Sequence, residues 1–302
     1  MTISSVSLKT AFINSNLCKK FFENEPMREH TSFKIGGPAD FFLMPETSDE
    51  LINIWRVCKK INMPLTILGD GNNVLVSDDG IRGAVVFTKK MNAVELCENE
   101  RLRADAGVLL SALASFARDA SLDGLPFASG IPGTVGGAIY MNAGAYNHEI
   151  AELVESVTLF LDDEIVVKSR DEMDFGYRRS FAQSDEMLIL SAVFNLRKGD
   201  SEKIREEMMD LNARRKKSQP LEYGSAGSFF KRPEGNFAGK LIEDSGLKGF
   251  SVGDAQVSEK HAGFVVNKGN ATCAEVLELM SHVKKTVYEK FGVELEPEVR
   301  IL

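Results

Sequence analysis

The sequence predicts an α+β fold built from more than one structural unit. Its 302 residues exceed the length of about 100 to 200 residues that is typical of one domain. Helical segments with an apolar stripe and short apolar strands are mixed along the chain. Because neither an internal repeat nor a low-complexity linker separates them, we expect the units to pack closely.

A turn rich in glycine and asparagine interrupts the first predicted strands. Thr47-Ser48-Asp49-Glu50 matches a capping box, and apolar residues follow it at helical spacing, which predicts a helix near 48–60. The apolar strand 64–68 then enters the turn Gly69-Asp70-Gly71-Asn72-Asn73, whose residue types tolerate positive φ, and a strand resumes at 74–76. The pattern further predicts strands at 83–88 and 101–105 and a helix at 109–120.

The segment from Ser129 to Tyr146, SGIPGTVGGAIYMNAGAY, is rich in glycine and has no charged side chain. Clustered glycines let backbone N–H groups converge on an anion, so this segment and the 69–73 turn are candidate phosphate-binding loops. Neither matches a P-loop, and no GxGxxG opens a helix after a strand, which argues against P-loop and Rossmann sites. Tight turns in a packed sheet are the alternative.

The second half of the chain is expected to complete a sheet and then form a further unit. Residues 157–161 and 165–167 flank Asp162-Asp163-Glu164 like the strands of a hairpin. The best domain boundary is Lys198-Gly199-Asp200-Ser201, ahead of a polar helix at 201–217. The remaining predicted elements are strands at 188–196, 251–258 and 263–267, a helix capped by Thr272 and Glu275 with the stripe Val276, Met280, Val283, Val287 and Phe291, and a period-two strand at 293–301.

Composition and charge argue against several classes of protein. The 43% apolar and 26% charged content is ordinary for a globular protein, and no apolar run approaches the roughly 20 residues that cross a bilayer. A net charge of -8 disfavours nonspecific nucleic-acid binding, so an anionic ligand needs local positive charge. The start of the chain lacks the features of a secretory signal, so we expect a cytoplasmic protein. The four cysteines have no CxxC spacing, which predicts reduced, buried thiols rather than a zinc ribbon.

Local sequence leaves the candidate catalytic positions ambiguous. Arg178 and Arg179 beside Tyr177 suit a carboxylate or phosphate, because arginine bonds such groups bidentately, but they also suit a solvated surface pair. Ser228 lies between small residues and bulky aromatics, where a Gly-Ser turn before a strand is the alternative. Glu298 lies on the charged side of the last predicted strand, as a plain surface carboxylate would.

The sequence also leaves the roles of the basic cluster and of His261 open. Arg214-Arg215-Lys216-Lys217 is the densest basic cluster, but cations are favoured at the end of any helix. His261 is one of four histidines and has no ligand spacing for a metal around it. A GxSxG nucleophile motif is missing, so nothing supports nucleophilic hydrolysis.

Taken together, several motifs resemble the UDP-N-acetylenolpyruvoylglucosamine reductase family. The similarity extends from His30 to the C-terminus, and the joint, ordered occurrence of the motifs is more specific than any one of them. The motifs are His30-Thr-Ser-Phe-Lys-Ile-Gly-Gly-Pro-Ala-Asp40, Leu68-Gly-Asp-Gly-Asn-Asn73, Gly130-Ile-Pro-Gly-Thr-Val-Gly-Gly137, Met141-Asn-Ala-Gly-Ala-Tyr146, Tyr177-Arg178, Gly227-Ser-Phe-Phe-Lys231 and Leu295-Glu-Pro-Glu-Val-Arg300.

The resemblance implies an FAD-binding domain of the vanillyl-alcohol-oxidase and para-cresol-methylhydroxylase type, split into two subdomains, and a C-terminal α+β substrate domain. We expect an N-terminal extension at 1–29, the FAD-binding domain at 30–198 with subdomains near 30–82 and 83–198, and the substrate domain at 199–302. The short link from Arg178 to Lys217 is similar to the subtype without an inserted tyrosine loop.

The resemblance also implies a reaction of peptidoglycan precursor synthesis, with FAD as cofactor. NADPH would reduce FAD and leave, and UDP-N-acetylglucosamine enolpyruvate would then be reduced to UDP-N-acetylmuramate by hydride from flavin N5. Ser228 would donate the proton, Arg178 would bind the developing negative charge at the substrate carboxylate, and Glu298 would hydrogen-bond the enediolate in its protonated form. We expect no metal, nucleic-acid, membrane or obligate protein partner.

Further site residues are implied position by position. Asn72 and Asn147 depart from the family that the motifs resemble, which often has serine and glycine there. The implied FAD contacts are Gly69, Asp70, Gly71, Asn72, Asn73, Val74, Gly130, Ile131, Pro132, Gly133, Thr134, Gly136, Gly137, Asn142, Ala143, Gly144 and Ala145. The implied substrate contacts are Tyr177, Lys217, Lys231, Arg232 and His261.

Two alternatives come from different classes. A different flavin oxidase on the same cofactor domain would not be expected to keep Ser228, Arg178 and Glu298 together. A nonenzymatic nucleotide-sugar binder would not be a yellow protein that NADPH bleaches.

Overall fold

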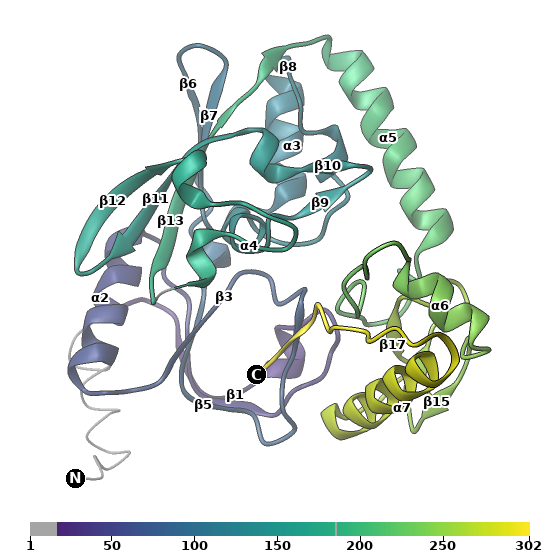
Figure 1. Cartoon of the computed structure of the whole chain (residues 1–302). Coiled ribbons are helices and arrows are strands. Elements are labelled where there is room, and N and C mark those ends of the chain that lie inside the picture. Colours follow the sequence, from purple (N-terminus) through teal and green to yellow (C-terminus); the bar gives the residue numbers. More distant parts are fainter. Residues whose placement is uncertain (1–16, 185) are drawn as a thin grey trace. The chain divides into compact units, whose positions relative to one another are not determined.

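The computed structural model describes residues 17–184 and 186–302, so part of the expected extension at 1–29 and the chain start used to argue against export lie outside the described residues. The chain divides into two compact units that alternate along the sequence (Figure 1). Unit 1 comprises Met1–Glu23, Asp40–Asp70 and Arg82–Leu211, and unit 2 comprises Asn24–Ala39, Gly71–Ile81 and Asn212–Leu302.

Two sheets organise unit 1. The larger one is antiparallel, with the strand order β12-β11-β13-β7-β6, and the smaller one has the order β1-β2-β5-β3. The strands are β1 (Phe21–Pro26), β2 (Pro38–Leu43), β3 (Leu65–Leu68), β5 (Ile81–Phe87), β6 (Val94–Cys97), β7 (Arg101–Asp105), β11 (Val154–Leu161), β12 (Glu164–Ser169) and β13 (Leu188–Asn195).

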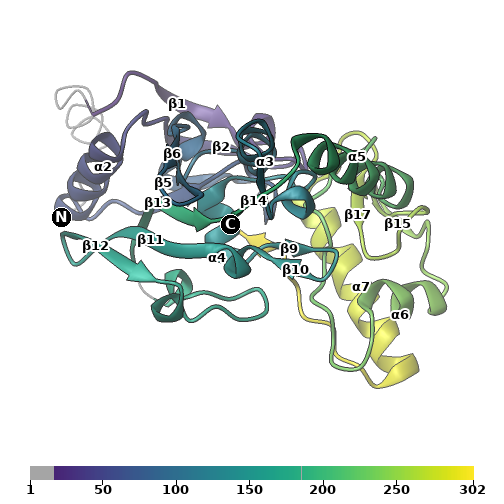
Figure 2. The same cartoon turned by 90° about the horizontal axis from the view of Figure 1, so that it is seen from above.

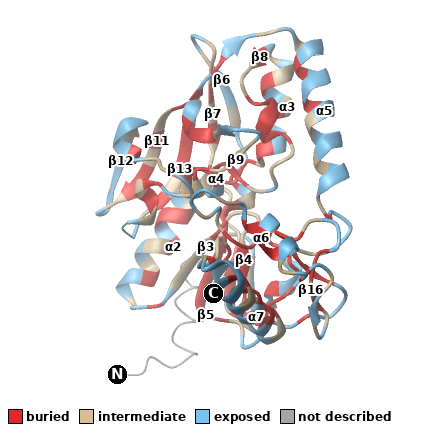
Figure 3. Cartoon of the chain, turned by 45° about the vertical axis from the view of Figure 1, so that its right-hand side comes forward, coloured by how far each residue is buried: buried red, intermediate tan, exposed pale blue. Residues whose placement is uncertain are grey.

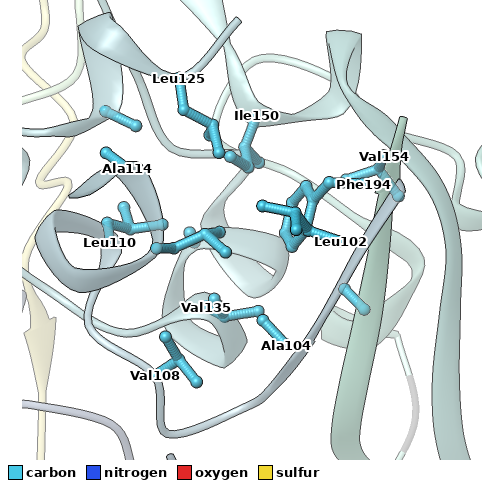
Figure 4. Close-up of a cluster of buried hydrophobic side chains, with 14 of the residues drawn as sticks. Leu102, Ala104, Val108, Leu110, Ala114, Leu125, Val135, Ile150, Val154 and Phe194 are labelled. Atoms are coloured by element: carbon cyan, nitrogen blue, oxygen red, sulfur yellow. The ribbon is translucent and has the colours of Figure 1, made fainter. Parts of the chain in front are cut away.

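The helices α3 (Leu110–Asp119) and α4 (Val135–Met141) pack on one face of the larger sheet. Figure 4 shows Leu110 of α3 and Val135 of α4 around the same core as Leu102 and Phe194 of the sheet. Alternate strand residues point to opposite faces, so this face is apolar at every second position. The core fixes α4, and with it the glycine-rich segment that precedes the helix.

The helix α2 (Ser48–Lys60) packs on the opposite face of the larger sheet and on the smaller sheet (Figure 2). Leu51 and Ile54 share one core with Val86 of β5 and Phe160 of β11. Thr47 caps the helix by accepting the N–H of Glu50, as predicted. The second hydrogen bond of the predicted capping box, from the N–H of Thr47 to the Glu50 carboxylate, is wrong. The Glu50 carboxylate accepts the N–H of Glu46 instead.

Short strand pairs and a long polar helix complete this part of the chain. The helix α5 (Ser201–Ser218) buries only Ile204 and Met208, and Figure 3 shows it exposed along most of its length. The short strands are β8 (Leu122–Asp123), which pairs with β14 (Arg197–Lys198), and β9 (Gly144–Ala145), which pairs with β10 (His148–Glu149).

Unit 2 has its own core around two helices and short strands. The helices α6 (Ala238–Asp244) and α7 (Cys273–Phe291) lie side by side (Figures 1 and 2). Thr272 and Glu275 form the predicted capping box, and Asp78 accepts the N–H groups of Cys273 and Ala274. The strands are β15 (Ser251–Val252), β16 (Ala255–Val257) and β17 (Val265–Asn267) in one antiparallel sheet, and β4 (Val74–Leu75), which pairs in parallel with β18 (Arg300–Ile301).

Most predicted elements form close to their expected bounds, with three exceptions. The segment 129–146 is not only a loop, because α4 forms inside it. The strand expected at 251–258 is a tight hairpin of β15 and β16. The strand expected at 293–301 is regular only at β18, since Pro297 has no N–H to donate and makes an isolated bridge to Phe230.

The described cysteines are free thiols, and Cys58 and Cys273 are buried whereas Cys18 and Cys97 are half-buried. Burial raises the pKa of Cys58 to about 12 and is the main cause that raises the pKa of Cys273 to about 11. Within residues 17–184 and 186–302, no helix has the length and hydropathy of a membrane span.

Candidate active site

Within unit 1, the first residue of the 69–73 turn contacts the 129–146 segment. A Cβ atom on Gly69 would lie 2.2 Å from Oγ1 of Thr134, so only glycine fits at this contact. Beside it, Asp70 forms an ion pair with Lys89. Gly71 belongs to unit 2, where its φ is +64° and a Cβ would lie 2.2 Å from the carbonyl oxygen of His30. Close approach and positive φ therefore explain the glycines of the 69–73 turn.

The glycine-rich segment contains the helix α4, and the first N–H groups of this helix are hydrogen-bonded within the protein. The N–H groups of Val135 and Gly136 donate to the carbonyls of Val108 and Ala106 at 2.8 and 2.7 Å. Thr134 caps the helix by accepting the N–H of Gly137. Gly133, just ahead of the helix, has a φ of +137°, and a Cβ there would meet nothing within 4 Å.

The backbone around Gly69 and Gly133 to Gly137, called the cofactor wall below, fits a cofactor that is held through backbone contacts. It has an open side at Gly133, no charged side chain between Ser129 and Tyr146, and a close packing partner at Gly69. No carboxylate within residues 129–146 would repel a diphosphate that approaches this main chain, and the neighbouring Asp70 carboxylate is paired with Lys89.

The side chain of Asn142 makes three hydrogen bonds within unit 1. The residue is 1% exposed, with a φ of +43° at the end of α4. Its Nδ2 donates to the Glu149 carboxylate at 2.8 Å and to the Gly176 carbonyl at 3.0 Å, and its Oδ1 accepts the N–H of Ala151. The side chain thus joins α4 to the loop that carries Arg178.

The family departure at Asn147 has a structural explanation. Tyr146 and Asn147 form the two-residue turn between β9 and β10, with φ values of +56° and +65°. This turn type needs positive φ at both positions, and asparagine adopts it more readily than most residues. Asn147 thus satisfies the backbone requirement that the glycine expected from the resemblance would also meet.

The adjacent arginines differ in their surroundings. Arg179 forms an ion pair with Asp174 at 3.0 Å. The guanidinium of Arg178 lies 5.1 Å from the centre of the half-exposed Tyr177 ring and donates to the carbonyl of Asn142 at 3.4 Å. The guanidinium of Arg178 is thus bonded to the residue that ends α4, and that of Arg179 to Asp174.

Ser228 and Glu298 lie on backbone segments that bond to each other within unit 2. The N–H of Glu298 donates to the carbonyl of Phe229 at 2.9 Å. On its other side, the segment bridges to Phe264 at Ser228. Ser228 is exposed, although Phe229 beside it is buried. Gly227 gives the chain a φ of +79° just ahead of Ser228, which is a position that favours glycine.

Lys231 and Arg232 follow on the same segment. Lys231 forms an ion pair with Glu296, and its N–H donates to the Glu296 carbonyl at 2.8 Å. Arg232 lies over the exposed ring of Phe237, with Cζ 3.9 Å from the ring centre. Both cations therefore lie near Ser228 along the chain, and each has a structural partner of its own.

His261 packs near the same segment of unit 2. Its ring meets Phe264 edge-on at 5.1 Å, and its Nδ1 accepts the N–H of Gly263 at 3.1 Å. Burial is the main cause that lowers the pKa of His261 below its usual value of 6.5. The neutral ring then carries its proton on Nε2, so His261 offers a hydrogen-bond donor near neutral pH.

Lys217 is exposed near the end of α5. The neighbouring Lys216 carbonyl accepts a hydrogen bond from Lys260 Nζ at 2.8 Å. This bond ties the basic end of α5 to the loop that carries His261. Of the predicted site residues, unit 2 therefore contains Ser228, Glu298, Lys217, Lys231, Arg232 and His261, whereas unit 1 contains Arg178 and Tyr177.

Sequence reasoning missed Gln183 as a residue of the Arg178 loop. Its Nε2 donates to the carbonyls of Arg178 and Tyr140. Because these acceptors are backbone atoms, no residue-type pattern in the sequence marks the contact.

Two protein-family models match the chain. A model of the UDP-N-acetylenolpyruvoylglucosamine reductase C-terminal domain matches residues 219–302. A model of an FAD binding domain matches residues 39–170.

Two relatives and one solved structure match more than 90% of this chain. The UDP-N-acetylenolpyruvoylglucosamine reductase of Caldanaerobacter subterraneus subsp. tengcongensis is 52% identical over 284 residues, which cover 94% of each chain. That of Clostridium novyi is 53% identical over 277 residues, which cover 91% of this chain and 90% of the relative. The crystal structure of the reductase from Thermus caldophilus matches with a TM-score of 0.79 at 34% identity, covering 93% of this chain and 98% of that one.

These matches confirm the predicted family and the predicted α+β fold with an FAD-binding domain. The chain belongs to the UDP-N-acetylenolpyruvoylglucosamine reductase family and is an FAD-dependent oxidoreductase.

Proposed function

We propose that the chain catalyses the NADPH-dependent, FAD-mediated reduction of UDP-N-acetylglucosamine enolpyruvate to UDP-N-acetylmuramate. The observation that carries this proposal is the bonded pair of segments that present Ser228 and Glu298, inside the region 219–302 that matches the reductase C-terminal domain. The product is a precursor of peptidoglycan, so the proposed cellular role is cell-wall synthesis in the cytoplasm, with consequences for cell shape and division.

FAD binding is assigned to residues 30–198 and substrate binding to residues 199–302. The matched ranges 39–170 and 219–302 lie within these bounds. Bound FAD would supply the hydride for the double bond and be reduced again by NADPH. The 69–74 turn and the backbone of residues 130–137 and 142–145 would hold it, with Gly69 and Thr134 in mutual contact.

Arg178 would bind the carboxylate of the enolpyruvyl group. Hydride addition to the β-carbon builds negative charge over the α-carbon and this carboxylate, and a guanidinium can bond a carboxylate bidentately. The hydrogen bond from the Arg178 guanidinium to the Asn142 carbonyl supports this role, because it holds the guanidinium at the end of α4. Charge stabilisation of this kind lowers the barrier because it is strongest where charge develops.

Ser228 would donate the proton to the α-carbon. A serine hydroxyl is a weak acid, so it can protonate only a strongly basic carbon and must regain its proton quickly, for example from water. The exposure of Ser228 in unit 2 supports such exchange.

Glu298 would stabilise the developing enediolate by donating a hydrogen bond in its protonated form. Its backbone bond to Phe229 supports the pairing with Ser228, because it ties both residues to one local framework.

The nucleotide part of the substrate carries a diphosphate, whereas the protein has a net charge of -8. Lys217, Lys231 and Arg232 would supply the local cations that such a ligand needs. Tyr177 and the neutral N–H of His261 would add contacts to the substrate.

One spectroscopic experiment tests the proposed function. Purified protein should be yellow, and NADPH should bleach it under anaerobic conditions. Addition of UDP-N-acetylglucosamine enolpyruvate should restore the colour, whereas enoates without the nucleotide should not. A colourless protein that binds the nucleotide sugar, or a flavin that only other enoates reoxidise, would contradict the proposal.

A further inference from the structure

The loop that carries Arg178 places it in a backbone conformation that few non-glycine residues adopt. Arg178 has a φ of +55°, in the left-handed region where Cβ crowds the main chain. Gly176 and Arg179 close the loop, each donating its N–H to the other's carbonyl at 3.0 and 3.1 Å. Such conformations persist where surrounding contacts stabilise them, and they cluster at functional sites.

Gln183 attaches this loop to the end of α4. Its Nε2 donates to the Arg178 carbonyl at 3.1 Å and to the Tyr140 carbonyl at 2.6 Å. The hydroxyl of Ser180 donates to the same Tyr140 carbonyl at 3.0 Å. Carbonyls in the last turn of a helix have no partner within the helix, so they are available for such contacts.

Asn142 makes a second attachment from the residue that ends α4. Its side chain donates to Gly176 at the start of the loop, and its carbonyl accepts the guanidinium of Arg178 at 3.4 Å. The side chain of Asn142 is fixed in turn by Glu149 and Ala151. Both the backbone and the head group of Arg178 are therefore bonded to this end of α4.

The helix α4 connects the Arg178 loop to the proposed cofactor wall. It begins directly after Gly133 and Thr134 and ends at the residues that bond the loop. Its seven residues span about 10 Å, so a rigid element of fixed length separates the two features. A displacement of the loop on this helix would change where Arg178 lies relative to the cofactor wall.

We propose that Gln183 and Asn142 are positioning residues that act through Arg178, setting its guanidinium for the substrate carboxylate. The inference rests on the role proposed for Arg178. A bidentate bond between guanidinium and carboxylate is sensitive to direction. A misplacement of about 1 Å at such a contact can slow a reaction by as much as about 10²-fold.

The test uses the FAD-loaded enzyme and the variant Gln183→Met, which keeps the length of the side chain and removes both donors. Flavin reduction by NADPH and flavin reoxidation by the enolpyruvyl nucleotide are measured separately by single-turnover absorbance. Reduction should stay within about twofold of the wild type, whereas reoxidation should slow by about 10- to 100-fold. The matched control Gln256→Met, whose amide bonds Gly249 and Ser251 in unit 2, should change neither step.

A double-mutant cycle separates positioning from general structural damage. In the Arg178→Ala background, addition of Gln183→Met should slow reoxidation by less than about twofold, because the residue through which it acts is gone. A full further loss in that background, or no loss in the wild-type background, would overturn the inference. If Arg178→Ala alone left reoxidation unchanged, the proposed role of Arg178 would fail first. If Gln183→Met did not fold, Gln183→Asn would enter the same cycle, because its shorter amide cannot bond both carbonyls.

Discussion

Asn73 donates a hydrogen bond from its side chain to the backbone carbonyl of Glu298 at 3.2 Å. Its own carbonyl accepts the N–H of Arg300 at 3.0 Å. The N–H of Glu298 meanwhile donates to Phe229, next to Ser228. Within unit 2, the backbone of Glu298 is therefore bonded both to the turn expected at the cofactor and to the segment that carries the proposed proton donor.

Replacement of Asn73 by alanine should weaken this arrangement. Loss of one hydrogen bond should lower the free energy of unfolding by about 1 kcal/mol, measured by urea denaturation. Flavin reoxidation by the enolpyruvyl nucleotide should slow more than flavin reduction by NADPH, because the role proposed for Glu298 belongs only to reoxidation. Equal slowing of both steps would instead make Asn73 a cofactor contact alone.

Replacement of Gly69 by alanine should destabilise the protein and reduce its FAD content. The added Cβ would lie 2.2 Å from Oγ1 of Thr134, and overpacking of this kind costs about 1–3 kcal/mol. Gly137→Ala is a matched control for stability, since its Cβ would lie 3.6 Å from the same oxygen. Thr134→Ala combined with Gly69→Ala should recover part of the loss, and strictly additive losses would argue against this contact.

The pKa of His261 predicts a loss of stability towards acidic pH. Burial lowers this pKa below 6.5, so the unfolded chain binds a proton before the folded protein does. The free energy of unfolding should therefore fall as the pH drops below about 6.5, and less so in His261→Asn. Urea denaturation at several pH values measures this difference. Identical pH profiles for both proteins would contradict the assigned burial effect.

The cysteines should differ in their reaction with thiol reagents. Burial raises the pKa of Cys58 to about 12, and Cys273 is also buried, so neither should react in the folded protein at about pH 8. Cys18 and Cys97 are both half-buried, but burial is the main cause that raises the pKa of Cys18, so Cys97 should react first in peptide mapping by mass spectrometry. Below about pH 9 the protonated Cys58 thiol favours the folded state, and this contribution should be lost as the pH rises towards 12. Modification of Cys58 as fast as Cys97 would show that this core opens readily.

The sequence predicted those elements whose signals are local. The α2 helix begins behind the Thr47 cap, and the β11–β12 hairpin forms around Asp162 and Asp163, which have positive φ. In both cases the residues that decide the structure lie within a few positions of one another, so the pattern carries the information.

The misses have physical causes. The α4 helix was not expected because glycine disfavours helices, yet Gly136 packs so closely on Ala106 that a Cβ would lie 3.0 Å from the Ala106 side chain. The alternating pattern at 293–301 correctly marks Leu295 and Val299 as buried, but alternation does not tell whether a continuous partner strand exists. In both the α4 helix and the 293–301 segment, tertiary packing rather than local sequence determines the structure.

The candidate site was predictable in its parts and not in its connections. Arg178, Ser228 and Glu298 come from matched motifs, whereas the bonds from Gln183 to Tyr140 and from Asn73 to Glu298 join backbone carbonyls 43 and 225 residues away. Backbone acceptors are the same for every residue type, so no sequence signal marks them.

The single-turnover kinetics of Ser228→Ala test the central claim most directly. The FAD-loaded variant should be bleached by NADPH at the wild-type rate, and reoxidation by UDP-N-acetylglucosamine enolpyruvate should slow by about 10²- to 10⁴-fold, the usual contribution of a positioned proton donor. Equal slowing of both steps, or reoxidation at the wild-type rate, would contradict the assignment of Ser228 as the proton donor.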